Sequence, residues 1–401
     1  MRVLELSWEY PPYIVGGLGQ HIAGLAPALG GLNTTFGPIQ VDLVTTRFAG
    51  GAPLEHLNQW VTVHRVDLPP IDPTNSYNDV VADNDLLAEH AAALAEKADY
   101  QIIHCHDWLT GAAGIALKNR FKVPLVVTVH ATERGRQQGN LPSEISVQID
   151  RLERNLCHEA WKIIACSNYM VRELRDYFGT PNDKVIVVSN GFDLSTHVLD
   201  TVQKEIALRR MYAPNGEHLL LYVGRITHEK GVHVLINAMP AILEEFPDTK
   251  LLIAVKNGRR LAPLAESLGV SHAVQFLGYI SDERRDHLYQ VVDAAVFPSL
   301  YEPFGIVALE AMGLGCNVIA SHVGGLSEVV QHREDGLTIY PDDPGSIAWA
   351  VRELFRDPLA AERRRERARQ KVIEKYSWQN VAESTARLFE SVALERVVTS
   401  W

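Results

Sequence analysis

Short runs of apolar, mostly β-branched residues recur along the chain, and a turn and an amphipathic stretch follow each of them. In the first half these runs are Val3–Leu6, Val41–Thr45, Val61–Val66, Ile102–Cys105, Leu125–Val129, Ile163–Cys166 and Val185–Val188. In the second half they are Leu219–Val223, Leu251–Ala254, Val274–Leu277, Ala294–Phe297, Val318–Ala320 and Leu337–Ile339. The runs are nearly continuous rather than alternating, which is typical of strands buried on both faces. Such strands, alternating with helices, predict an α/β fold with parallel, doubly wound sheets.

A pause in this pattern divides the chain. Residues 190–217 contain Asn-Gly and Pro-Asn-Gly turns and one short charged helix, but no clear buried strand. The 401 residues are enough for two domains of about 100–200 residues each. We therefore predict an N-terminal Rossmann-like domain over residues 1–195, a linker over 196–215 and a C-terminal Rossmann-like domain over 216–377. Two such domains facing each other leave a cleft lined by the carboxyl ends of both sheets, where ligands bind.

Composition and charge exclude several classes of protein. The net charge of -11 argues against a nucleic-acid partner, although it is compatible with a local basic cleft for phosphates. No run of 18 apolar residues occurs, so we expect no stable membrane insertion. The first residues lack a signal-peptide pattern, and the four cysteines are scattered without CxxC spacing. We therefore expect a cytoplasmic protein whose cysteines are reduced.

The turn after the first apolar run is rich in glycine. Gly16, Gly17 and Gly19 occur there and lead into a predicted helix. Paired glycines let the backbone approach a phosphate closely, and a helix N-terminus favours an anion. A tight strand–helix turn accounts for these glycines equally well. The spacing is not the GxGxxG of a dinucleotide site, which excludes a dinucleotide-dependent oxidoreductase.

Two cations lie in the corresponding turn of the second half. Arg225 and Lys230 are five residues apart, between a predicted strand and a predicted helix. Arginine supplies a planar fork of donors and lysine a point charge, and the dipole of the following helix adds to both. Both side chains can therefore converge on a diphosphate.

Two glutamates, Glu302 and Glu310, lie eight residues apart around the start of a predicted helix. The carboxylate of Glu302, in the loop, can bind sugar hydroxyls. The backbone amides of Gly305, Ile306 and Val307 can face an anion at the start of the helix. Glu310, about one turn inside, can accept both hydroxyls of a ribose. The other interpretation is an ordinary helix N-terminus with surface acids.

Histidines follow two strands of the first half. His104, His106 and Asp107 end one apolar run, and His130 follows the next one. Adjacent histidine and cysteine suggest a metal, but neighbouring side chains on a strand point to opposite faces, and the further ligands of a zinc site are missing. We therefore expect no metal here, and we interpret these strand ends as a polar surface that contacts sugar.

Taken in order, these motifs resemble those of the retaining glycosyltransferases of GT-B fold, the superfamily of glycogen and starch synthases and sucrose synthase. The similar positions cover essentially the whole chain: Gly16–Gly19, His104–Trp108, His130, Asn190-Gly191, Gly224-Arg225, Glu229–Gly231, Glu302 with Glu310, and Gly324-Gly325. The paired glutamates with Pro-Phe-Gly between them are the most specific mark. Segments 8–12 and 130–136 are similar to members that resemble glycogen synthase. Residues 376–378 resemble the closing motif, after which the last helix, residues 378–401, is expected to pack on the first domain.

The resemblance implies an enzyme that moves a sugar from a nucleotide-diphosphate sugar to an acceptor hydroxyl with retention of the anomeric configuration. It implies that Arg225 and Lys230 neutralise the leaving diphosphate and that the backbone of Gly17 approaches it. It implies no separate cofactor, because the nucleotide sugar is itself the donor substrate. Preorganised cations and amides are then the main catalytic device, since the departing diphosphate gains negative charge.

The resemblance also assigns the remaining polar residues. Glu310 is expected to hold the ribose, and Glu302, His130 and Asp107 are expected to surround the donor sugar or the acceptor. No nucleophile for a covalent intermediate is evident. The family expectation is attack on the front face of the sugar within an ion-pair-like complex, in which the leaving phosphate accepts the proton of the acceptor.

The leading hypothesis is transfer of glucose from ADP-glucose or UDP-glucose to the non-reducing end of an α-1,4-glucan, as in glycogen synthase. One alternative is a related transferase that makes a small product, such as maltose 1-phosphate or a sucrose-like compound. Another is transfer of a different sugar, such as mannose, to a glycan or lipid. A non-catalytic binder is disfavoured because the charged residues named above are all present. The oligomeric state is not readable from the chain.

Overall fold

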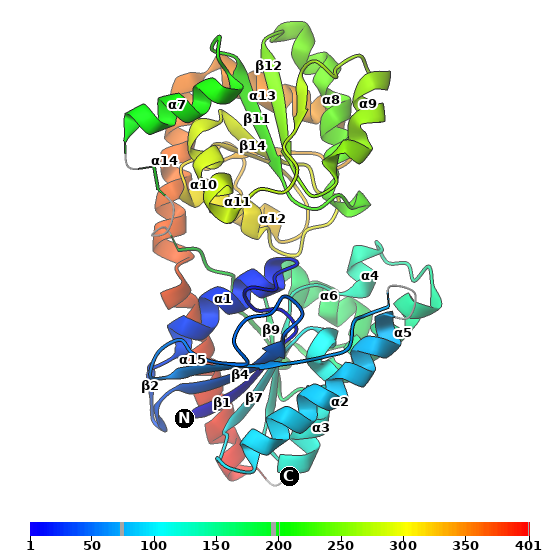
Figure 1. Ribbon diagram of the computed structural model, residues 1–401, viewed down its shortest axis with the longest axis vertical. Helices are drawn as coiled ribbons and strands as arrows, with labels where there is room; N and C mark the ends of the chain where they lie inside the picture. Colours follow the sequence, from blue (N-terminus) through cyan, green and yellow to red (C-terminus); the bar gives the residue numbers. More distant parts are fainter. Residues whose placement is uncertain (73–75, 194–197, 200, 400) are drawn as a thin grey trace. The chain divides into compact units, whose positions relative to one another are not determined.

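The computed structural model describes residues 1–72, 76–193, 198–199, 201–399 and 401. The chain forms two compact units (Figure 1). The first unit consists of Met1–Gly191 together with Trp378–Trp401, and the second consists of Phe192–Ser377. Each unit is built around one mainly parallel sheet covered by helices, which confirms the predicted α/β fold class.

The sheet of the first unit has the strand order β10-β9-β8-β7-β1-β4-β6-β5. Its neighbouring strands are parallel, apart from the antiparallel pair β5–β6. The strands are β1 (Arg2–Ser7), β4 (Gln40–Thr46), β5 (Leu54–His56), β6 (Val61–Val66), β7 (Ile102–His106), β8 (Leu125–Val129), β9 (Lys162–Ala165) and β10 (Val185–Val187). Two further short strands, β2 (Asn33–Thr34) and β3 (Gly37–Pro38), form a separate antiparallel pair that precedes β4 in the sequence. Because the central strands are buried on both faces, they carry few polar side chains, and each polar side chain there is a candidate for a functional role.

The helices of the first unit include one from the far end of the chain. They are α1 (Gly17–Leu29), α2 (Ser76–Ala95), α3 (Gly111–Phe121), α4 (Glu133–Arg136), α5 (Glu144–Glu159), α6 (Asn168–Phe178) and α15 (Trp378–Val398), with short 3-10 turns η1 (Trp108–Thr110) and η2 (Asn182–Lys184). Helix α15 packs on α1, where Ile22 and Phe389 belong to one buried core. A Cβ atom on Gly24 would lie only 2.0 Å from the indole of Trp378, so the glycine allows this close approach.

The second unit has a sheet of order β13-β12-β11-β14-β15-β16 in which all strand pairs are parallel. Its strands are β11 (His218–Val223), β12 (Thr249–Ala254), β13 (Val274–Phe276), β14 (Ala294–Phe297), β15 (Val318–Ser321) and β16 (Leu337–Ile339). Its helices are α7 (Val202–Tyr212), α8 (Val232–Glu245), α9 (Ala262–Ser267), α10 (Asp282–Val291), α11 (Ile306–Gly313), α12 (Leu326–Val329), α13 (Pro344–Arg356) and α14 (Pro358–Lys375), with 3-10 turns η3 (His228–Lys230) and η4 (Gly258–Leu261). The strand order changes direction between β11 and β14, and ligands of open α/β sheets bind at such a switch point.

The predicted linker over 196–215 is wrong as an independent segment. Its helix α7 belongs to the second unit, because Arg209 donates hydrogen bonds to the carbonyl of Val291 at 2.6 Å and to Asp293 at 2.9 Å. The second unit also begins at Phe192, whose backbone N–H bonds the carbonyl of Tyr376 at 2.6 Å. The sequence pattern missed these contacts because α7 carries few buried apolar residues. Residues 73–75 and 194–195 of the predicted first domain, 196–197 and 200 of the predicted linker, and 400 of the predicted last helix lie outside the described residues.

Within the described part of the chain, every helix is too short or too polar to cross a lipid bilayer.

Candidate active site

The first unit places Asp107 and His130 together at the carboxyl ends of β7 and β8. Oδ1 of Asp107 accepts the backbone N–H of His130 at 2.7 Å. The carboxyl of Asp107 is buried, and this burial raises its pKa to about 6 against the opposing effects of Arg136 and the backbone donors. Asp107 therefore holds the segment that begins at His130, and it can carry a proton near neutral pH.

A chain of buried polar groups extends behind His130. Its Nε2 atom lies 3.0 Å from Nδ1 of His106, and Nε2 of His106 lies 2.6 Å from Oε1 of Glu5. Nδ1 of His104 lies 2.9 Å from the same oxygen but outside hydrogen-bond alignment, and Nε2 of His104 bonds the hydroxyl of Thr128 at 2.7 Å. Sequence reasoning missed Glu5, although a glutamate inside a buried apolar run is itself a signal.

His21 on α1 completes this group of imidazoles. Its Nδ1 atom lies 2.6 Å from Oδ1 of Asn190, and its Nε2 atom has no hydrogen-bond partner among the described residues. Burial, together with the neighbouring imidazoles, lowers the pKa values of His21 and His106, and it lowers the pKa of His130 to about 3. All three rings are therefore neutral at physiological pH.

The same cluster brings together groups that bind metals in other proteins. Ring nitrogens of His21, His106 and His130 lie within 4.8 Å of one another. Zinc, however, binds histidine nitrogen at about 2.0–2.1 Å with tetrahedral angles. The facing nitrogens of His106 and His130 lie 3.0 Å apart and the ring centres 5.3 Å apart, so the two in-plane nitrogens point at each other rather than at a common third point where an ion would lie. As arranged, this pair fits a hydrogen bond rather than an ion.

The glycine-rich turn at the start of α1 holds a carboxylate from the protein itself. Oε2 of Glu9 accepts the backbone N–H groups of Val15 and Gly16 at 2.8 and 3.0 Å. Gly17 is the first residue of the helix beyond this contact. Sequence reasoning missed Glu9, and two of the amides near Gly17 are thereby occupied.

In the second unit, Lys230 and Glu302 meet although they are distant in sequence. Nζ of Lys230 lies 2.7 Å from Oε2 of Glu302, and the hydroxyl of Ser299 also approaches that oxygen, at 3.4 Å. Lys230 ends η3, after β11, and Glu302 lies in the loop after β14. Gly231 makes this approach feasible, because it has a left-handed φ of 65° and a Cβ atom there would lie 1.9 Å from the carbonyl oxygen of Pro298.

Arg225 lies in the same turn but is more open. Its side chain is 52% exposed, and its guanidinium lies 3.8 Å from Glu229. Its backbone carbonyl accepts the hydroxyl of the buried Tyr222 at 2.9 Å, which ties the turn to β11. Arg225 is thus a cation on a fixed backbone with a side chain that is largely available to a ligand.

The loop from Glu302 to α11 is held by glycines. Gly305 has a φ of 104°, and the helix begins directly after it at Ile306. The backbone carbonyl of Glu302 accepts the N–H of Gly325 at 2.9 Å. The first N–H groups of a helix have no partner within the helix, so those of Gly305, Ile306 and Val307 suit an anion.

Glu310 is a buried carboxyl with spare hydrogen-bonding capacity. Its Oε1 atom lies 3.4 Å from the guanidinium of Arg285 on α10, whereas its Oε2 atom has no partner among the described residues. Burial raises the pKa of Glu310 to about 7, against the opposing charge of Arg285. Sequence reasoning missed Arg285, whose charge faces this carboxyl.

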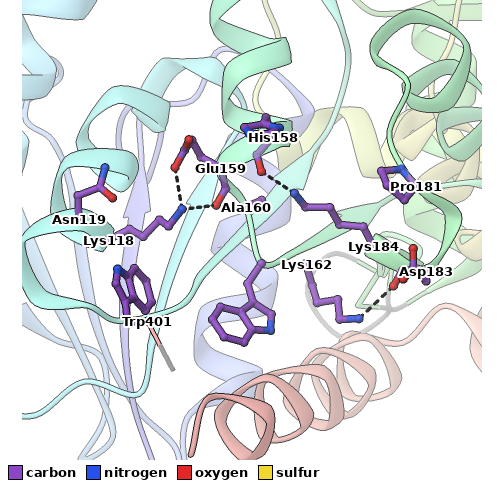
Figure 2. Close-up of a pocket in the computed structure, with 11 residues that line it drawn as sticks. Lys118, Asn119, His158, Glu159, Ala160, Lys162, Pro181, Asp183, Lys184 and Trp401 are labelled. Atoms are coloured by element: carbon purple, nitrogen blue, oxygen red, sulfur yellow. Dashed lines mark hydrogen bonds and ion pairs between the residues drawn. The ribbon is translucent and has the colours of Figure 1, made fainter. Parts of the chain in front are cut away.

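A cavity of about 530 Å³ in the first unit lies elsewhere (Figure 2). Its lining includes Lys118, Lys162, Lys184 and Trp161, and none of the predicted site residues. Lys162 begins β9, so the cavity is at the amino end of the parallel sheet, opposite the end where His130 lies. Its ammonium groups already bind protein oxygens, as the dashed lines in Figure 2 show.

Comparisons with known proteins agree with this picture. The family described as "Glycosyl transferases group 1" matches residues 204–371, and "Glycosyltransferase Family 4" matches residues 15–196. An uncharacterized glycosyltransferase of Methanocaldococcus jannaschii is 38% identical, over 98% of this chain and 99% of its own length. The glycogen synthase of Mycobacterium tuberculosis is 35% identical, over 97% of this chain and 94% of its own length.

Solved structures support the same fold. The sucrose-phosphate synthase of Thermosynechococcus elongatus superposes with a TM-score of 0.83 at 24% identity, over 98% of this chain and 100% of that one. At that identity the likeness shows the fold alone. Together with the full-length relatives above, it shows that this chain belongs to the group 1 glycosyltransferases of GT-B fold and is similar to glycogen and starch synthases.

Proposed function

We propose that this glycosyltransferase moves glucose from ADP-glucose or UDP-glucose to the non-reducing end of an α-1,4-glucan, with retention of the anomeric configuration. The observation that carries the proposal is the ion pair of Lys230 with Glu302, which joins the turn after β11 to the loop after β14, while Arg225 offers a second cation from the same turn. Similarity over nearly the full length to a glycogen synthase supports the choice of glucose and glucan.

The cations suit a diphosphate leaving group. Arg225 offers a largely exposed guanidinium, and Lys230 an ammonium that Glu302 holds at 2.7 Å. Negative charge develops on the diphosphate as the glycosidic bond to it breaks, so these fixed charges stabilise the transition state more than the ground state. The amides at the start of α11, which have no partner within the helix, and the backbone of Gly17 supply further contacts to phosphate.

The carboxyl groups suit hydroxyls. The unpartnered Oε2 atom of Glu310 can accept a ribose hydroxyl, and Glu302 can bind a hydroxyl of the transferred sugar. His130 and Asp107 in the first unit are assigned to the donor sugar or the incoming acceptor. The leaving phosphate then accepts the proton of the acceptor hydroxyl on the same face of the sugar, which accounts for retention without a covalent intermediate.

A second candidate is a related transferase with a small acceptor or another sugar. The relatives include D-inositol 3-phosphate glycosyltransferases at up to 31% identity, and this resemblance favours a phosphorylated small-molecule acceptor as the alternative. The same cation and carboxylate residues serve both reactions, because both release a nucleoside diphosphate.

The experiment is a matrix of nucleotide-release assays. ADP-glucose, UDP-glucose and GDP-mannose are each offered with glycogen, with glucose 1-phosphate, with inositol 3-phosphate and with no acceptor. Release of ADP or UDP that depends on glycogen supports the proposal, and an early proton NMR spectrum of the product reports the anomeric configuration. Release that depends only on a small acceptor establishes the alternative, and an inverted product refutes the proposed mechanism.

The matched control for the site is a pair of arginine variants in the second unit. Arg225→Ala is expected to lower turnover about 100- to 1000-fold. Arg363→Ala removes an exposed arginine on α14 and is expected to leave turnover unchanged. Equal activity of the two variants would overturn the role of Arg225.

A further inference from the structure

Glu5, His106 and His130 form a linear chain of hydrogen bonds, and the geometry of its outer link is well defined. The rings of His106 and His130 are nearly parallel, with 20° between their planes and 5.3 Å between their centres. Their facing nitrogens are 3.0 Å apart. The distance between the ring centres exceeds the distance between the nitrogens by about the sum of the two ring radii. Both nitrogens therefore lie on the line that joins the ring centres. Each in-plane nitrogen therefore points directly at the other, as a hydrogen bond requires.

The buried end of the chain decides which nitrogen carries the hydrogen. A carboxylate oxygen accepts hydrogen bonds, so Nε2 of His106, 2.6 Å from Oε1 of Glu5, is the nitrogen that donates. A neutral imidazole has one N–H, which leaves Nδ1 of His106 as a bare acceptor. The hydrogen in the outer link must then come from Nε2 of His130. It follows that Nδ1 of His130 is also a bare acceptor.

Burial separates the roles of the three residues. Glu5 and His106 are 1% and 0% exposed, whereas His130 is half-buried. A ligand can therefore reach His130 but not the two residues behind it. Register explains how they meet: β1 lies beside β7 in the sheet, Glu5 is paired with His104, and His106 is two residues further along the same face.

We propose that Glu5 and His106 are positioning residues that hold His130 as the Nε2–H tautomer, so that its Nδ1 atom accepts a hydroxyl of the sugar. This inference rests on the proposed function for the contact between His130 and sugar. The orientation of the ring itself follows from the protein contacts alone. The hydrogen-bonded series Glu5–His106–His130 resembles the carboxylate groups that orient catalytic histidines in other enzymes. In those enzymes, loss of the orienting group changes the tautomer of the histidine.

The tautomers can be measured directly, whatever the substrate. Long-range nitrogen–proton NMR of protein labelled with ¹⁵N-histidine distinguishes Nδ1–H from Nε2–H, and the His106→Asn and His130→Ala variants assign the signals. We expect both His106 and His130 to be neutral Nε2–H tautomers. In Glu5→Gln the new amide can donate as well as accept, so we expect a mixture of tautomers at both rings. An Nδ1–H signal for His106 in the native protein, or unchanged tautomers in Glu5→Gln, would overturn the proposal.

Steady-state kinetics then test whether the hydrogen bonds from Glu5 through His106 to His130 contribute to sugar transfer. His106→Phe keeps a ring but removes the acceptor for His130. We expect kcat to fall about 10- to 100-fold, the effect of losing one strong hydrogen bond, with little change in the KM for the donor. His106→Asn restores an acceptor near the position of Nδ1 but not the bond to Glu5. We therefore expect it to recover at least a tenfold part of the loss. Equal defects in the two variants would show a merely structural role and overturn the proposal.

Cys105→Ala provides a control for damage to β7. Cys105 lies between the two histidines, is fully buried and points to the opposite face of the strand. The kcat of the Cys105→Ala variant is expected to stay within about threefold of the native value. Thermal unfolding of every variant shows whether it is folded. If His130→Ala has full activity while the NMR result holds, the proposed function of His130 fails and the positioning chain stands.

Discussion

Nζ of Lys230 lies 2.7 Å from Oε2 of Glu302, a contact that joins the turn after β11 to the loop after β14 across 72 positions of sequence. Both side chains are largely buried, with 20% and 11% exposure. The carboxylate thus holds the ammonium in place before any phosphate arrives. Preorganisation of this kind is what gives a fixed charge its effect on a transition state.

Replacing Lys230 tests this arrangement. Lys230→Ala is expected to lower kcat about 100- to 1000-fold, because it removes one preorganised cation from the leaving diphosphate. Lys230→Arg is expected to recover only part of the loss, since a guanidinium presents a fork rather than a point charge. Nucleotide release at saturating donor measures the effect. A Lys230→Ala enzyme that keeps more than a tenth of the native kcat would contradict the assignment.

Glu310 predicts a pH dependence of stability. Its pKa is raised from 4.5 to about 7 in the folded protein. Between these values the folded state keeps a proton that the unfolded state has released, so this group lowers stability as pH rises from about 4.5 to about 7. The linkage constant gives a change on the order of 3 kcal/mol. Glu310→Gln removes this dependence.

Urea unfolding at several pH values between 4.5 and 7.5 measures the effect. The stability of Glu310→Gln relative to the native protein should rise with pH across this window. A difference that is constant with pH would show that the carboxyl titrates normally. Glu334→Gln, a variant of an exposed glutamate in the same unit, serves as the control.

Gly231 has a strict steric requirement that a second glycine lacks. A Cβ atom at Gly231 would lie 1.9 Å from the carbonyl oxygen of Pro298, and its φ is 65°. Gly269 has a similar φ of 71° but open space around it. We expect Gly231→Ala to cost about 3 kcal/mol or more, since overpacking adds to backbone strain, and Gly269→Ala about 1–2 kcal/mol. Chemical unfolding of both variants compares them, and equal costs would show that only backbone strain matters.

Gly24 tests how the C-terminal helix joins the first unit. A Cβ atom there would lie 2.0 Å from the Trp378 ring, so Gly24→Ala is expected to displace α15 and lower the thermal midpoint by several degrees. Tryptophan fluorescence reports the change at Trp378. Gly16→Ala has open space around the new methyl group and should leave the midpoint within a degree or two. Similar midpoints for the two variants would mean that α15 does not depend on this contact.

Much of the fold follows from local pattern. Continuous apolar runs such as Leu125–Val129 become central strands because only strands buried on both faces need such composition. The predicted linker was wrong because α7 is held by the ion pair of Arg209 with Asp293, rather than by an apolar stripe. Arg209 and Asp293 are 84 positions apart, so the local sequence pattern around either residue does not indicate their contact.

The sequence by itself determined which residues could carry the chemistry. Arg225, Lys230, Glu302 and His130 follow apolar runs, where strand ends in parallel sheets bind ligands, and Glu310 lies about one turn inside the helix that follows Glu302. Their roles in transfer remain the prediction that the assays above examine. Only the tertiary structure decided their partners. Strand order places β1 beside β7, and so sets Glu5 against His106, while helix packing brings Arg285 toward Glu310. The physical reason is that strand order and helix packing depend on contacts summed over the whole sheet, and these contacts join residues far apart in the chain.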